Sequence, residues 1–191
     1  MPIILFDTAQ RNLLHPFTGI RAIADIRAGI LTIRERWEKL TGQKIYVLTE
    51  PYLQAAYLNP PAGEKILVNA AVIADKNLVN LIMNLQVNEA LVKEGAVIAA
   101  VSPAGEDWTI HTIVPEKFKK CISCNLALKK ISYPWHIFQW NDDLIRSDFA
   151  LITANRLHQS ATNIYGWTAP ENIFIENGVA ISHCFINASE G

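Results

Sequence analysis

The run PIILF at residues 2–6 is apolar at every position. Strands of this kind are typical of a parallel sheet that is covered on both faces. Two further strand-like runs follow, KIYVLTE at 44–50 and KILVNAAVI at 65–73, and helical patterns separate the three. Strands that alternate with helices predict right-handed β-α-β crossovers. The sequence therefore predicts an α/β fold with a Rossmann-like, mostly parallel sheet and helices on both faces.

Two helices are predicted from apolar spacing, one between the first two strands and one after the third. Isoleucine, tryptophan and leucine residues recur at spacings of three and four between residues 23 and 40, and the helix is expected from about Ile30 to Gly42, a typical stop residue. Asp75 stands where an N-cap is expected, before a second apolar stripe at 78–85. A short helix is also expected at 52–57.

The middle of the chain predicts a mixture of elements. Residues 89–102 read as a hairpin that turns at KEG, and 108–114 as another short strand. We expect helices at 115–121 and over YPWHIFQWNDDLIRSDFALIT, where apolar residues keep a helical spacing.

The last residues show a different period. Ile173, Val179 and Phe185 are six apart, as are Ile175 and Ile181, which is typical of a coil of a parallel β-helix. One coil cannot bury its own faces, so we expect a fragment of a longer chain or a tail that docks elsewhere. We divide the chain into an α/β domain at 1–156, and a connector with the start of a left-handed parallel β-helix at 157–191.

Composition limits the partners. A net charge of −1 gives no field for a nucleic acid polymer, and no basic helix or long apolar run points to a membrane. Three cysteines agree with a reducing, cytoplasmic setting. Only 18% of the residues are charged, which favours a homo-oligomer or a missing neighbouring domain.

Cations follow the first strand closely. Pro16 and Thr18 lie among four arginines at positions 11, 21, 27 and 34. A loop at the carboxyl end of a parallel strand is where α/β proteins bind ligands, and arginine binds phosphate in a bidentate way. Asp7, Arg11, Arg21 and Asn69 are all expected near this edge, which predicts a phosphate ligand.

The order of these features resembles a known family. The chain is similar to bacterial sugar-phosphate nucleotidyltransferases of the divergent subgroup joined to a hexapeptide-repeat acyltransferase. This subgroup is described as a two-function uridylyltransferase and acetyltransferase that acts on N-acetylglucosamine 1-phosphate. The likeness is carried by segments spread over most of the chain: IILFD, RNLLHPFTGIR, RAGILTIRERWEKLTG, ILVNAAVI, YPWHIF and ENIFIENGVAI. The resemblance implies Mg²⁺ as cofactor, and UTP or dTTP with N-acetylglucosamine 1-phosphate or glucose 1-phosphate as substrates.

The sequence also departs from the wider family. No glycine lies between Phe6 and Thr18, where that family has a glycine-rich loop. Ala22 and Ile23 stand where that family has Pro-Lys. The triplet Asn69-Ala70-Ala71 stands where that family has a magnesium-binding Asp. These differences favour the alternative of a degenerate domain that binds a nucleotide sugar, or that regulates or assembles an attached acyltransferase without transferring a nucleotide itself.

The candidate residues each have two interpretations. Arg11 either clamps the triphosphate, or is a solvated loop arginine or a partner for Asp7. Thr18 either bonds a phosphate or starts a turn. Arg21 or Arg27 could replace the missing lysine in catalysis or binding. The alternative for Arg27, which the spacing favours, is a place on the outer helix face with Arg34, paired with Glu38.

Two residues follow the third strand. Asp75 is either a magnesium ligand or only the N-cap, and Asn69 contacts the base or ribose or only caps the strand.

Overall fold

The computed structural model describes residues 1–158 and 166–190. The chain forms two units, Met1–Asp148 and Phe149–Gly191, each of which is described by itself.

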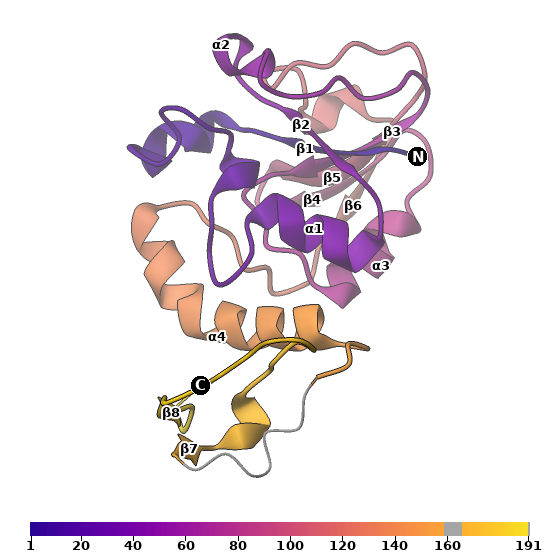
Figure 1. The fold of residues 1–191 in the computed structure, drawn as a ribbon. Coiled ribbons are helices and arrows are strands. Elements are labelled where there is room, and N and C mark those ends of the chain that lie inside the picture. The colour runs from indigo at the N-terminus through magenta and orange to yellow at the C-terminus, as the bar shows by residue number, and fades with distance from the viewer. Residues whose placement is uncertain (159–165, 191) are drawn as a thin grey trace. The chain divides into compact units, whose positions relative to one another are not determined.

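In the described residues, the first unit contains a six-stranded mixed sheet of order β2-β1-β3-β5-β4-β6 (Figure 1). Strand β1 is parallel to β2 and β3, β4 is parallel to β6, and β5 is antiparallel to β3 and β4. The predicted mostly parallel α/β sheet is therefore confirmed. The strands are β1 (Ile3–Phe6), β2 (Ile45–Leu48), β3 (Lys65–Asn69), β4 (Glu89–Lys93), β5 (Ala96–Ser102) and β6 (Lys120–Ser123).

Capping side chains and a glycine set where the helices begin and end. Thr32 and Glu35 form a capping box at the start of α1, and Gly42 ends this helix at φ 65°. Asp75 caps α3 by accepting the Leu78 amide at 2.8 Å, as predicted. The described α-helices are α1 (Ile33–Thr41), α2 (Pro51–Gln54), α3 (Lys76–Met83) and α4 (Pro134–Thr153), and short 3-10 helices are η1 (Ala9–Leu14), η2 (Ile23–Asp25) and η3 (Pro115–Lys117).

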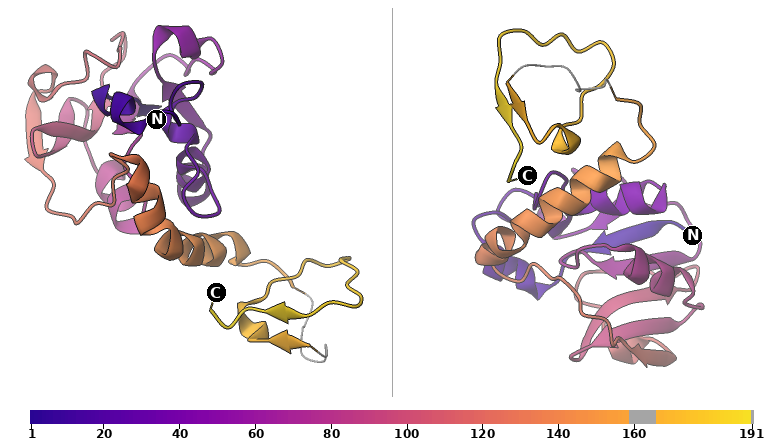
Figure 2. Two further views of the ribbon diagram at one scale, coloured as in Figure 1. Left: turned by 90° about the vertical axis from the view of Figure 1, so that its left-hand side faces the viewer. Right: turned by 90° about the horizontal axis from the view of Figure 1, so that it is seen from below.

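The two faces of the sheet are covered differently. Ile3 and Leu5 of β1 face a core built with α1, α3 and the first part of α4 (Figures 1 and 2). Ile4 and Phe6 face the irregular segment 103–119, in which Trp108 stacks on Phe118 with ring centroids 5.3 Å apart. The expectation of helices on both faces is wrong, because a segment with two prolines and a glycine covers the second face with aromatic side chains.

Two local predictions in this segment are also wrong. Residues 108–114 form turns instead of a strand, and the expected helix at 115–121 is a single 3-10 turn followed by the edge strand β6. The hairpin at 89–102 is confirmed as β4 and β5, which turn at Glu94 and Gly95.

The second unit pairs two short parallel strands, β7 (Trp167–Thr168) and β8 (Ile186–Asn187), with the 3-10 helix η4 (Pro170–Asn172) between them. Val179 and Phe185, which the six-residue period places inside a coil, are exposed. A β-helix is therefore not shown by residues 166–190. None of the described helices has both the length and the apolar character needed to cross a bilayer.

Candidate functional site

The carboxyl ends of three parallel strands meet at one edge of the sheet. Phe6 is in register with Leu48 on β2 and with Asn69 on β3. Asp7 and Thr49 directly follow β1 and β2, and both are buried. The Thr49 hydroxyl donates to Asp7 Oδ2 at 2.6 Å, so these two strand ends are joined by a polar contact.

Arg11 lies in η1, within the loop that follows β1, and is 2% exposed. Its Nη1 donates to Asp7 Oδ2 at 2.5 Å and to Thr49 Oγ1 at 3.1 Å. Its Nη2 donates to the Thr18 carbonyl and to the Tyr52 hydroxyl, the latter at 2.9 Å. Both terminal nitrogens are engaged inside the protein, so a phosphate could reach Arg11 only after these bonds had opened.

Asp7 is held by several donors at once. Its Oδ1 accepts the Ile23 amide at 2.9 Å, while Oδ2 accepts from Arg11 and Thr49. Burial raises the pKa of the Asp7 carboxyl, and the bonds from Thr49 and Ile23 and the charge of Arg11 oppose this rise. Because both oxygens already accept bonds from the protein, Asp7 does not fit the role of a magnesium ligand.

Thr18 and Asn69 are also buried and bonded within the protein. Thr18 Oγ1 donates to the Arg11 carbonyl at 2.7 Å. Asn69 Oδ1 accepts the Ala71 amide at 3.0 Å, and Nδ2 lies 3.5 Å from the Val97 carbonyl. These contacts shape the loop after β1 and the turn after β3.

Arg21 differs from these residues because it is exposed. Among the described residues, none forms an ion pair with Arg21. Thr18 and Ala22 are both fully buried, so the loop rises out of the protein between them and presents Arg21 to solvent. Of the two proposed catalytic arginines, Arg21 is the one whose guanidinium forms no ion pair within residues 1–158 and 166–190.

The hydroxyl groups of Tyr52 and Tyr57, in the segment after β2, bind this loop. The Tyr57 hydroxyl accepts the Ala22 amide at 2.9 Å and donates to Asp25 Oδ2 at 2.8 Å. Burial and the neighbouring Asp25 raise the pKa of Tyr57 to about 12. Sequence analysis missed this role, and the only available signal was two tyrosines five residues apart beyond the carboxyl end of a strand.

The remaining two arginines, Arg27 before α1 and Arg34 on α1, are paired. Arg27 lies before α1, where its guanidinium bonds the Ile30 carbonyl and lies 3.5 Å from Glu35. Its expected position on the outer helix face beside Glu38 is therefore wrong, because the helix starts only at Ile33. Arg34 pairs with Asp25 at 2.9 Å.

Asp75 borders a cleft of 630 Å³ that is lined by charged side chains. Lys129 lies 2.7 Å from Asp143, and Arg36 lies 2.5 Å from the buried Asp148. The cleft therefore offers cations that carboxylates already neutralise. Asp75 is exposed and uses Oδ1 to cap α3, and the described residues contain no cluster of three or more side chains suited to a metal ion.

The fold and the loop define the class. A mixed α/β domain with a cationic loop over the carboxyl edge of its parallel strands is built like a nucleotide-binding domain. The chain belongs to the sugar nucleotidyl transferase family, whose model matches residues 3–157.

A solved structure is similar to this chain. A Bacillus anthracis protein assigned as a glucose-1-phosphate thymidylyltransferase, solved in complex with sucrose, is similar at a TM-score of 0.46 and 10% identity. The match covers 76% of this chain and 95% of that one. No curated protein sequence matches this chain.

Proposed function

We propose that this chain makes a nucleotide sugar from a nucleoside triphosphate and a sugar 1-phosphate. A phosphate oxygen of the sugar phosphate attacks the α-phosphorus, the bond to the β-phosphate breaks, and pyrophosphate leaves. Membership of the sugar nucleotidyl transferase family over residues 3–157 is the observation that carries this proposal. The substrates we propose are UTP or dTTP with N-acetylglucosamine 1-phosphate or glucose 1-phosphate.

In this proposal Arg21 contacts the triphosphate, and Arg11 positions the loop. Catalysis of phosphoryl transfer depends mostly on positioning and charge neutralisation, so an exposed, unpaired guanidinium is suited to the developing negative charge. Asp7, Arg11 and Thr18 are buried, and the hydrogen bonds of Arg11 with Asp7 and Thr18 fix the path of the loop that follows β1.

We propose that Mg²⁺ binds together with the phosphates of the substrate. Mg²⁺ is bound through one or two carboxylates together with substrate phosphates, and it neutralises phosphate charge. Asp75 fits one such contact, because its side chain is exposed and only one of its oxygens caps α3.

The test is release of pyrophosphate, coupled to pyrophosphatase, for the four pairs of proposed substrates with Mg²⁺. We expect release that requires both substrates, and a loss of about 100-fold in Arg21→Gln. Lys119→Gln is the matched control, since this exposed cation lies in the segment 103–119 that covers the other face of the sheet. Wild-type protein that releases no pyrophosphate with any pair contradicts the proposal.

A second candidate is binding of a nucleotide sugar without transfer. It is favoured by the burial of Asp7, Arg11 and Asn69, whose polar groups are already bonded within the protein. Thermal stabilisation by a UDP- or dTDP-sugar, in protein that forms no product, would support this candidate over the first.

A further inference from the structure

The Tyr57 hydroxyl bridges two points of the loop that carries Arg21. It accepts from the Ala22 amide at 2.9 Å, directly after Arg21, and donates to Asp25 at 2.8 Å. A hydroxyl has one proton to donate and lone pairs to accept, so both capacities are used here. Tyr57 follows α2 and is therefore remote in sequence from the loop that it holds.

The loop is also held on the other side of Arg21. The Tyr52 hydroxyl, which accepts from Arg11, lies 3.2 Å from the Gly19 carbonyl and donates to it. Ile20, which is 81% exposed, and Arg21 are the two residues between these tyrosine contacts. The backbone is thus fixed at Gly19 and at Ala22, while the two residues between them extend into solvent.

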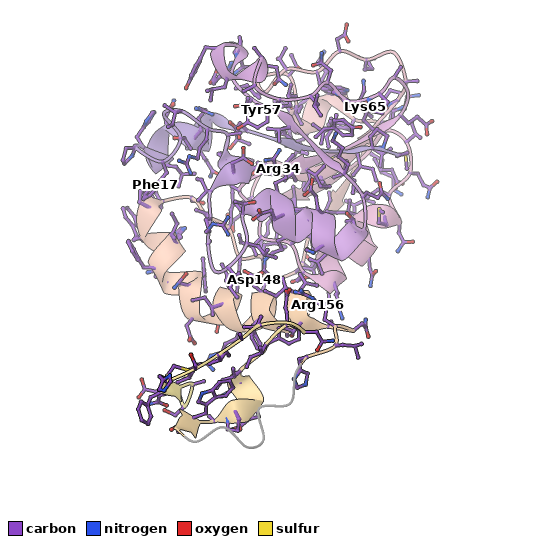
Figure 3. The ribbon with its side chains drawn as sticks, in the orientation of Figure 1. Phe17, Arg34, Tyr57, Lys65, Asp148 and Arg156 are labelled. Atoms are coloured by element: carbon purple, nitrogen blue, oxygen red, sulfur yellow. The ribbon has the colours of Figure 1, made fainter. Side chains whose placement is uncertain are left out.

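In the part of the chain that the structure describes, the charges near the loop leave Arg21 without an ion-pair partner. Asp25 is the carboxylate closest to Arg21 in sequence, and it pairs with Arg34 at 2.9 Å while it accepts from Tyr57. The side chains of Tyr57 and Arg34 reach it from the segment after α2 and from α1 (Figure 3). Asp25 is therefore engaged away from Arg21.

We propose that Tyr57 is a positioning residue that fixes the loop backbone so that the Arg21 guanidinium is ready to bind nucleotide phosphates. This inference rests on the proposed function for the identity of the ligand, but it concerns binding and is tested without turnover. A loop that is already fixed loses less conformational freedom when the phosphate binds, so the hydroxyl increases affinity without touching the ligand.

The experiment is calorimetric titration of UTP and dTTP into wild-type protein and Tyr57→Phe. We expect Tyr57→Phe to bind the nucleotide about 3- to 10-fold more weakly than wild-type protein does, which is the range for one or two net hydrogen bonds. Tyr46→Phe is the matched control, because Tyr46 is a half-buried tyrosine on neighbouring β2, and it should stay within about two-fold of wild type. Asp25→Asn is the second variant, expected to weaken binding in the same direction, and thermal unfolding checks that each variant is folded.

A double-mutant cycle with Arg21→Gln separates positioning from general destabilisation. In the Arg21→Gln background, Tyr57→Phe should cause no further loss, because the residue that it positions is gone. Equal losses in both backgrounds, unchanged affinity in Tyr57→Phe, or wild-type protein that binds neither nucleotide would overturn the inference. Binding that depends on Tyr57 in protein that releases no pyrophosphate would retain the inference and reject the transferase.

Discussion

Arg36 and Asp148 form a buried ion pair, with Nη2 and Oδ1 2.5 Å apart, that joins α1 to α4. The other Asp148 oxygen accepts the Ile30 and Leu31 amides at 3.0 and 3.1 Å. The Asp148 carboxylate therefore holds α4 both to α1 and to Ile30 and Leu31, which lie just before α1.

Asp148→Asn should destabilise the protein by about 3 kcal/mol. The substitution leaves the buried Arg36 charge without its counter-ion, and breaking a buried pair costs about 3–5 kcal/mol. Urea unfolding measures the effect. Asp142→Asn removes the exposed partner of Arg146 and should cost at most about 1 kcal/mol. Similar losses in the two variants would show that the buried pair contributes no more than a surface pair.

Arg11 and Arg21 should separate stability from activity. Arg11→Met leaves Asp7 buried without its cation and should lower the free energy of unfolding by about 3 kcal/mol. Arg21→Gln alters an exposed side chain and should change it by less than about 0.5 kcal/mol, while pyrophosphate release falls. Denaturant unfolding and the coupled assay, run on the same preparations, test both statements. An Arg11→Met protein as stable as wild type would contradict the structural role of Arg11.

Tyr57 should titrate later than an ordinary tyrosine. Its pKa is raised to about 12, so the folded state holds the phenolic proton more tightly than the unfolded state does. Stability should therefore fall as pH rises from about 10 to about 12. Tyrosinate absorbance should show one late-titrating group that is absent in Tyr57→Phe. Asp25→Asn should bring this pKa down, because the Asp25 charge and hydrogen bond help to raise it; an unchanged titration would contradict that cause.

Local signals allowed much of the fold to be predicted. The apolar run of β1 and the Asp75 cap of α3 depend on neighbouring residues, and both are found where expected. Strand β6 was missed because KCIS is a mostly exposed edge strand without an apolar run. The six-residue period near the C-terminus was a pattern in sequence alone, since Phe185 is 88% exposed.

The candidate site was less predictable, because its contacts join residues that are far apart in sequence. An arginine-rich loop indicates cations, but the sequence does not say which of them are neutralised. Arg11 is bound by a carboxylate four residues away, whereas Arg34 reaches back to Asp25 and leaves Arg21 unpaired among the described residues. The tyrosine that holds Asp25 is 32 positions further along the chain. Packing decides these pairings, and no local pattern encodes them.

Gly29→Ala should be among the most damaging small substitutions in the first unit. Gly29 has φ 81°, and an added Cβ would lie 2.6 Å from Asp148 Oδ2 and 2.8 Å from Leu144 Cβ. Gly42→Ala is the matched control, because Gly42 has a similar φ of 65° and its Cβ would meet nothing within 4 Å. We expect a loss of about 1 kcal/mol at Gly42 from backbone strain alone, and about 3 kcal/mol at Gly29, where α4 must also shift. Urea unfolding of the two variants measures the difference, and equal losses would mean that α4 does not press on the backbone at Gly29.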